Sequence, residues 1–240
     1  MQDRYAGDLG DFSKFALMRS LLADLRCSAG LIWYRFPDES TNNDGRHTRY
    51  LGDSRWDGTD PALIDTLQGI IDGGTRSIQA LESSTILPAD TSYFGESIFW
   101  EKDLARNRSD WFKRACAAVQ VSDLVMVDPD NGLAGPSHKV WRRKGGKYVT
   151  TDEVAALANA HKCVVVYHHF NRSCSHEAQM RMWVEQLSSA SPDRNVQVLR
   201  YKRVSPRAYF ILSRSDALKA VESSVERLCS GAWSYHFERG

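Results

Sequence analysis

The fold is decided by DLVMVDPDNG, residues 123–132, in which a short apolar run leads into a polar turn. The predicted strand, residues 123–127, starts at Asp123, continues with four apolar residues without interruption and ends at Asp128. A strand that helices cover on both faces has this composition, so the run predicts a central parallel strand. Pro129 removes one backbone donor and stiffens the exit of the strand. Asp130 and Asn131 then lie in a turn, which their residue types favour.

The segments around this stretch alternate between strands and helices. Residues 31–36, closed by Pro37, and the apolar residues 163–167 are further predicted strands, and 196–203 and 207–213 form a late strand pair. Apolar residues recur at three- and four-residue intervals in the predicted helices. These cover residues 11–26 with Asp11 as N-cap, 61–81 with a break at Gly73-Gly74, 101–121, 151–161 with a capping box of Thr150 and Glu153, 176–189 and 217–229.

This alternation predicts an α/β fold with a doubly wound, mostly parallel sheet of the Rossmann type. The late strand pair indicates one antiparallel strand inserted at the C-terminal end of the sheet. The 240 residues suit one large domain, 1–240, and contain no repeat or obvious linker. Residues 37–60 and 132–149 are predicted loops, and a loop as long as 37–60 is often functional.

Overall composition excludes several classes of protein. The formal net charge is +1, so nucleic-acid binding would rest on a local patch. The five cysteines are widely spaced without a C-x-x-C pair, which argues against a disulfide framework or zinc ribbon. No apolar run is long enough to span a membrane, and the start at Met1 does not resemble a signal peptide. We therefore expect a cytoplasmic protein without a membrane partner.

Ligands of open α/β sheets bind outside the carboxyl ends of the strands. Three polar segments follow predicted strands and are the expected site: Pro37-Asp38-Glu39, Asp128-Pro129-Asp130-Asn131 and His168-His169-Phe170-Asn171-Arg172. Asp128 can accept a hydrogen bond from an amino group or bind a metal, although an ordinary turn explains the same residues. An acidic residue at 38 or 39 can hold a ribose, whereas one glycine in residues 37–47 does not make a phosphate-binding loop.

The histidines after residue 167 support a second interpretation. His168, His169 and His176, together with Asp128 and Asp130, can form a Mg²⁺ or Mn²⁺ site of a nuclease or hydrolase, although their spacing matches no standard motif. Successive strand residues point to opposite faces, so His168 and His169 cannot both face one ligand if the strand continues through them. One of these histidines is then expected to be structural.

A basic segment follows the expected site. Residues 138–148 carry five cations and no acid, including Arg142, Arg143 and Lys147, with Trp141 and Tyr148 among them. Cations bind phosphates and aromatic rings stack on bases, so the segment predicts contact with a nucleic acid or nucleotide. A solvated loop is the alternative. His169, Asn171 and Arg172 are further candidate substrate-binding residues.

Residues 5–15, YAGDLGDFSKF, contain a small-residue turn followed by Asp, Lys and the start of a helix. This segment and Asp128-Pro129 are two motifs that resemble the ribosomal-RNA adenine-N6 methyltransferases, a family with the class I methyltransferase fold that uses S-adenosylmethionine. Asp128-Pro129 resembles its Asp-Pro-Pro-Tyr motif, and the late strand pair resembles the end of its sheet. Asp130 and Asn131 replace the second Pro and the Tyr, and no glycine-rich loop follows Phe36.

The resemblance implies roles for particular residues. Asp128 accepts a hydrogen bond from the target amino group, and the Pro129 carbonyl helps to orient that group. Asp8 and Lys14 lie near the cofactor or the substrate. With Asp130, Asn131 and His168 as further catalytic candidates, and Asp38 and Glu39 as cofactor candidates, the first hypothesis is a methyltransferase-like enzyme acting on a nucleic acid or nucleotide. The alternatives are the metal-dependent nuclease or hydrolase and a non-catalytic binding module on the same scaffold.

Overall fold

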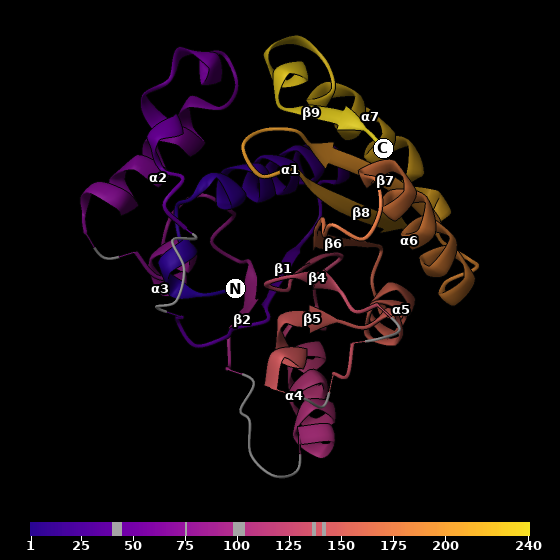
Figure 1. Ribbon diagram of the computed structural model, residues 1–240. Coiled ribbons are helices and arrows are strands. Elements are labelled where there is room, and N and C mark those ends of the chain that lie inside the picture. The colour runs from indigo at the N-terminus through magenta and orange to yellow at the C-terminus, as the bar shows by residue number, and fades with distance from the viewer. Residues whose placement is uncertain (40–44, 75, 98–103, 136–137, 141–142) are drawn as a thin grey trace.

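Strand β3 (Leu124–Asp128) lies inside a sheet with the strand order β2-β1-β3-β6-β8-β7-β9 (Figure 1). The computed structural model describes residues 1–39, 45–74, 76–97, 104–135, 138–140 and 143–240, without the side chains of 104–106, 143 and 144. Around β3, the other strands of this sheet are β1 (Ala29–Trp33), β2 (Ser92–Phe94), β6 (Cys163–His169), β7 (Asn195–Tyr201), β8 (Arg207–Ser213) and β9 (Phe237–Arg239).

Strand directions confirm the prediction of a mostly parallel sheet with a late antiparallel insertion. β2, β1, β3 and β6 are parallel neighbours. β8 runs antiparallel between β6 and β7, and β9 adds antiparallel to β7. In the register, Trp33 faces Asp128 and Val127 faces Val166, so the carboxyl ends of β1, β3 and β6 meet at one edge.

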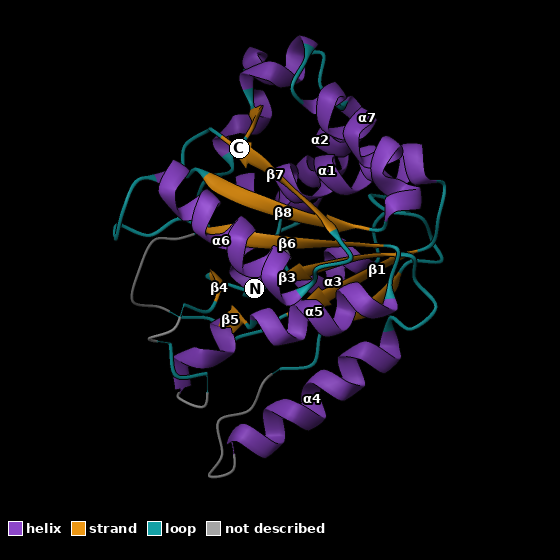
Figure 2. Cartoon of the chain, turned by 90° about the vertical axis from the view of Figure 1, so that its right-hand side faces the viewer, coloured by secondary structure: helices purple, strands orange, loops and turns teal. Residues whose placement is uncertain are grey.

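Helices cover both faces of the sheet, as the apolar strands require. α1 (Leu9–Leu25), α2 (Pro61–Asp72), α3 (Ile78–Glu82) and α7 (Leu218–Leu228) contribute to the apolar core on one face. α4 (Leu104–Ala118), α5 (Thr151–Ala160) and α6 (His176–Ala190) contribute to the core on the other. Figure 2 shows the sheet between these layers, with α1, α2 and α7 above the strands and α4 and α5 below. Among the described residues, no helix combines the length and apolar character needed to cross a bilayer.

Alternation along β3 decides where its terminal aspartate points. Leu124 and Met126 pack into the core on the α1 face, whereas Val125 and Val127 pack into the core on the α5 face. Asp128 is next on the α1 side, because successive strand residues face opposite ways. The sequence thus aims a carboxylate from the carboxyl edge of the sheet toward α1.

Several element boundaries differ from the sequence predictions. α1 begins at Leu9 because Asp8, and not Asp11, accepts hydrogen bonds from the first free amides of the helix. The predicted helix 61–81 is two helices, α2 and α3, separated around Gly73-Gly74 as the break indicated. The capping box of Thr150 and Glu153 is confirmed. The start of the predicted helix at 101–103 lies outside the described residues.

Short strands in three places were not predicted from the sequence. β2 and β9 are each three residues long and sit at the two edges of the sheet. Within the predicted loop 132–149, β4 (Gly132–Leu133) pairs in parallel with β5 (Tyr148–Val149). Pairs this short have too few residues to show a hydrophobic period. Their effect is to hold the segment after Asp128 against the segment that carries Lys147.

Candidate functional site

A cavity of about 270 Å³ opens at the carboxyl edge of the sheet, between the strand exits and the start of α1. Polar and charged side chains from six separate parts of the sequence surround it. The lining consists of Met1, Tyr5, Asp8, Gly10, Lys14, Gly45, His47, Asp128, Pro129, Asp130, Asn131, Lys147, Tyr167, His169, Ser205 and Arg207. The cavity therefore lies where ligands of open α/β sheets bind.

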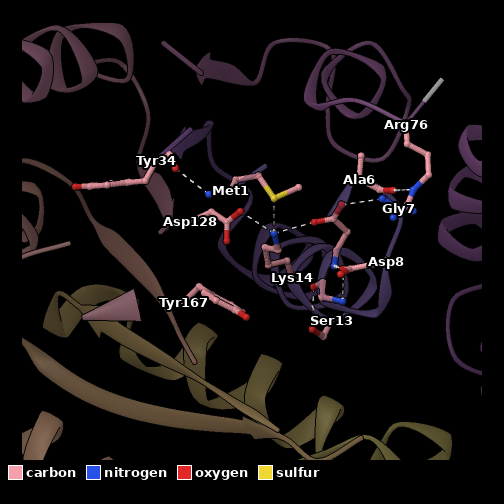
Figure 3. Close-up of polar contacts among 12 residues, drawn as sticks. Met1, Ala6, Gly7, Asp8, Ser13, Lys14, Tyr34, Arg76, Asp128 and Tyr167 are labelled. Carbon is pink, nitrogen blue, oxygen red and sulfur yellow. Dashed lines mark hydrogen bonds and ion pairs between the residues drawn. The ribbon is translucent and has the colours of Figure 1, made fainter. Parts of the chain in front are cut away.

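Lys14 lies at the base of this cavity between two carboxylates. Its Nζ is 2.7 Å from Asp128 Oδ2 and 2.8 Å from Asp11 Oδ1. The three side chains are almost fully buried, with exposed fractions of 4%, 2% and 0% for Lys14, Asp128 and Asp11. Figure 3 shows the ammonium of Lys14 directed at Asp128, with Met1 on one side and the ring of Tyr167 on the other.

Protonation within this triad follows from burial and charge. Burial opposes the charge on Lys14, but Asp11 and Asp128 outweigh it and raise the pKa of Lys14 above its usual value. Burial raises the pKa of Asp11 to about 6, although the ammonium of Lys14 acts in the opposite direction. Lys14 consequently stays charged near neutral pH and does not serve as a base. Its role is to hold Asp128 in place and to compensate its charge.

A second ion-pair group forms the opposite wall. Lys147 Nζ lies 2.9 Å from Asp130 Oδ2 and 2.6 Å from Glu39 Oε2, and the side chain of Gln2 also donates to Asp130 at 2.9 Å. Burial opposes ionisation of Asp130, but the nearby amino terminus and Lys147 keep its pKa below the usual value. Asp130 is thus a charged acceptor that joins the β3 exit to the segment before β5.

The residues around Asn131 complete the strand exit through backbone contacts. The Asn131 amide donates to the Lys147 carbonyl at 2.8 Å, and the Asn131 carbonyl accepts from the His169 amide at 3.3 Å. His169 lines the cavity on β6, where its Nδ1 lies 3.3 Å from the hydroxyl of Tyr167. Asp128, Asp130, Asn131, Asp8, Lys14, Lys147 and His169 are the sequence-predicted residues that the structure brings to one cavity.

The chain start occupies the exit of β1. The Met1 amino group donates to the Tyr34 carbonyl at 2.8 Å, and the Phe36 amide donates to the Met1 carbonyl at 2.8 Å. The candidate cofactor residues nearby are engaged elsewhere: Asp38 accepts from the Arg4 amide, and Glu39 pairs with Lys147. Neither residue lines the cavity.

His168 lies on the opposite face of the sheet from the cavity. The residue is 2% exposed, and its ring packs against Trp183 and Phe210, while Nδ1 accepts a hydrogen bond from the Leu133 amide at 3.1 Å. Burial, and then the neighbouring His169, lower the pKa of His168 to about 3. The ring is neutral at physiological pH and anchors β4, so the structure places His168 in a structural position.

Other predicted residues also lie apart from the cavity. Asn171 caps a turn, accepting from the Ser173 amide, and Arg172 is exposed beside it. His176 stacks on Phe170 with ring centroids 4.1 Å apart. Arg142 lies outside the described residues, and for Arg143 only the backbone is described, in a 3₁₀ helix over Arg143–Lys147.

The residues of the metal-site interpretation do not converge on one point in the structure. In the described part of the chain, no group of three or more His, Cys, Asp or Glu side chains is placed to hold a metal ion. Asp128 and Asp130 each have a lysine as partner, and His168 and His176 lie away from both. A divalent ion would have to displace those lysines from the carboxylates.

Several residues of the cavity were not predicted from the sequence. Tyr5, His47, Tyr167, Ser205 and Arg207 line it. Arg207 is the first residue of β8, and an antiparallel strand starts at the edge where its parallel neighbours end. The predicted strand pair could have indicated Arg207, because the first residue of an antiparallel strand lies beside the carboxyl ends of its parallel neighbours.

No protein-family model matches this chain, and the curated proteins contain no significant match. The class of the molecule therefore comes from its own geometry. It is a mixed α/β protein whose mostly parallel sheet carries a polar cavity at its carboxyl edge.

Proposed function

We propose that this protein is a methyltransferase-like enzyme that acts on an amino group of a nucleic acid or nucleotide. The observation that carries the proposal is that Asp128, in the cavity wall, has one carboxylate oxygen bound and, within the described part of the chain, the other without a donor. Lys14 binds Oδ2, and among the described residues no donor binds Oδ1. A carboxylate whose second oxygen has no donor is suited to accept an N–H group of the substrate.

The order of the strands supports this proposal. An antiparallel strand between the last two parallel-running strands is the feature by which the sequence resembles the class I methyltransferase sheet, and β8 holds that position between β6 and β7. Asp128-Pro129 follows β3, and both residues line the cavity. Fold similarity alone does not determine function, so the argument rests on the site.

The lining also suits the charges of S-adenosylmethionine, which carries a carboxylate, an amino group and a sulfonium. Arg207 offers a partner for a carboxylate, Asp8 offers a partner for a cationic group, and Tyr167 offers an aromatic face. When bound, this cofactor supplies the methyl group. Met1 covers the exit of β1 through its bond to the Tyr34 carbonyl. A cofactor would therefore meet these side chains in the cavity and not directly at the β1 exit.

Within this reaction the residues of the chain have separate roles. Asp128 accepts an N–H of the target amino group, orients its nitrogen and stabilises the positive charge that develops there during transfer. Lys14 positions the carboxylate through the ion pair at 2.7 Å. Because Lys14 and Asp128 are fixed by burial, this acceptor requires little reorganisation during the reaction.

The test is transfer of a tritiated methyl group from S-adenosylmethionine to RNA, DNA and a panel of nucleotides. We expect incorporation by the wild-type protein and a loss of at least about 100-fold in Asp128→Asn, by analogy with removal of one stabilising group at a reaction centre. Asp123→Asn is the matched control, because Asp123 is exposed just before the other end of the same strand. Equal transfer by Asp128→Asn and wild type would overturn the assigned role.

The same preparation distinguishes the other two hypotheses. Binding of nucleic acid without methyl transfer, together with no affinity for the cofactor, would favour a non-catalytic module. Cleavage of nucleic acid that requires Mg²⁺ or Mn²⁺ would favour a nuclease. Either result counts against the methyltransferase proposal.

A further inference from the structure

Arg207 is a buried cation whose charge has no ion-pair partner among the described residues. It begins β8, is 6% exposed and lines the cavity. Its Nε donates to the Ser205 carbonyl at 3.0 Å. Among the described residues, this Nε contact is the side-chain hydrogen bond that Arg207 donates, and its terminal Nη1 and Nη2 have no acceptor.

The position of the guanidinium is fixed by its surroundings. Its central carbon lies 5.8 Å from the ring centroid of Tyr167 and 5.7 Å from that of Tyr201. On the other side it approaches the start of α1 so closely that a Cβ on Gly10 would lie 2.4 Å from Nη1. Asp8 Oδ1 is nearby, but it accepts from the Gly10 and Asp11 amides of the helix.

The two lysines of the lining, unlike Arg207, each have carboxylate ion-pair partners. Lys14 has Asp11 and Asp128 as partners, and Lys147 has Glu39 and Asp130. An arginine remains charged in a protein, and a buried charge without a partner is costly. A rigidly held guanidinium with two unused N–H edges is suited to a planar or tetrahedral oxyanion.

We propose that Arg207 binds the anionic group of the cavity's ligand, a phosphate or carboxylate oxyanion. The inference rests on the proposed function for the identity of that ligand, since the oxyanion belongs either to the phosphate of the nucleotide substrate or to the carboxylate of the cofactor. Both groups present two oxygens to a guanidinium, and Asp128 lies in the same cavity for the amino group. Arg207 would thereby fix the ligand at the end opposite the reacting nitrogen or methyl group.

The test is calorimetric binding of two pairs of probes, in which one member of each pair lacks the anionic group. AMP and adenosine differ by the phosphate, whereas S-adenosylhomocysteine and 5′-methylthioadenosine differ by the amino-acid part that bears the carboxylate. The variant is Arg207→Met, and the matched control is Arg203→Met, whose guanidinium stacks on Tyr235 with its central carbon 3.5 Å from the ring centroid and does not line the cavity. Gly10→Ala is a second variant, which displaces the guanidinium and keeps its charge.

We expect Arg207→Met and Gly10→Ala to lose at least about 10-fold in affinity for the anionic member of one pair, with little change for its neutral or truncated member. A loss confined to AMP assigns a phosphate, and a loss confined to S-adenosylhomocysteine assigns a carboxylate. If wild type binds AMP better than adenosine but neither cofactor analogue, the oxyanion site stands and the methyltransferase proposal fails. Unchanged affinities in both variants, or no binding of any probe by wild type at millimolar concentration, would overturn the oxyanion site.

Discussion

The ammonium of Lys14 lies 2.7 Å from Asp128 Oδ2, across a sequence separation of 114 residues. One residue belongs to the first turns of α1 and the other to the last position of β3. Both side chains are buried, and each supplies the charge that makes burial of the other tolerable. This contact joins the start of the chain to the centre of the sheet and forms the base of the cavity.

Removal of the Lys14 charge is expected to be strongly destabilising. Lys14→Met keeps much of the side-chain volume but leaves Asp128 and Asp11 buried without their cation. We expect a loss of about 3 to 5 kcal/mol in the free energy of unfolding, measured with urea. Lys113→Met is the control, because Lys113 forms an exposed pair with Asp110 and such pairs contribute about 0 to 1 kcal/mol. A loss below about 1 kcal/mol in Lys14→Met would contradict the assigned role of this ion pair.

Gly132, which closes the turn after Asp128, cannot be replaced without strain. Its φ is +100°, and a Cβ there would lie 2.5 Å from His168 Nδ1 and 2.7 Å from the backbone of His168. We expect Gly132→Ala to lose about 2 kcal/mol or more in thermal or urea unfolding. Gly69→Ala should instead gain up to about 1 kcal/mol, because Gly69 lies in α2 with open space around it. Equal effects of the two substitutions would show that the turn is not restrained as described.

His168 is expected to make stability depend on pH below neutrality. Its pKa falls from 6.5 to about 3 in the folded protein, so the unfolded chain binds more protons between these values. Stability contributed by the neutral ring is therefore present above pH 6.5 and lost as the pH falls through this window. From pH 7 to pH 5 the loss amounts to about 2 kcal/mol.

The check on this prediction is the pH dependence of unfolding in His168→Asn. Asn can still accept from the Leu133 amide but does not titrate, so the difference in stability between pH 7 and pH 5 should shrink by about 2 kcal/mol. The comparison uses this difference because the smaller side chain also lowers stability at every pH. An unchanged pH dependence would show that His168 titrates normally in the folded state.

Periodic and apolar segments account for what the sequence predicted well. The uninterrupted apolar runs of β3 and β6 and the spacing in α5, α6 and α7 predicted their elements to within a few residues. The strand pair β7 and β8 was placed correctly, including the antiparallel insertion. The short edge strands β2 and β9 were missed because three residues carry no recognisable period.

The site was predictable where strand exits determine position. Asp128, Asp130, Asn131 and His169 follow buried strands and line the cavity as expected from their positions. His168 does not line the cavity, because it points to the other face of the sheet from His169. The alternation of side chains along β6 predicts this difference. Arg207 depends on strand order and on the approach of α1, which no local pattern reveals.

The ion pairs around the cavity join residues that are far apart in the sequence, so they are the feature of the site that local sequence patterns predict least. Lys147 contacts Glu39 over 108 residues, and the pairing of β4 with β5 brings its segment into reach. A basic run in the sequence predicts a charged surface, yet in the structure this lysine pairs with the buried Asp130 and the partly exposed Glu39. Sequence composition does not separate these two uses of a cation.

The most direct test of the central proposal is calorimetric titration of the wild-type protein with S-adenosylhomocysteine, the product of methyl transfer from the cofactor. The methyltransferase assignment predicts saturable binding at about one ligand per chain, competed by S-adenosylmethionine. Absence of any binding heat or thermal shift at millimolar concentration of both compounds would contradict it.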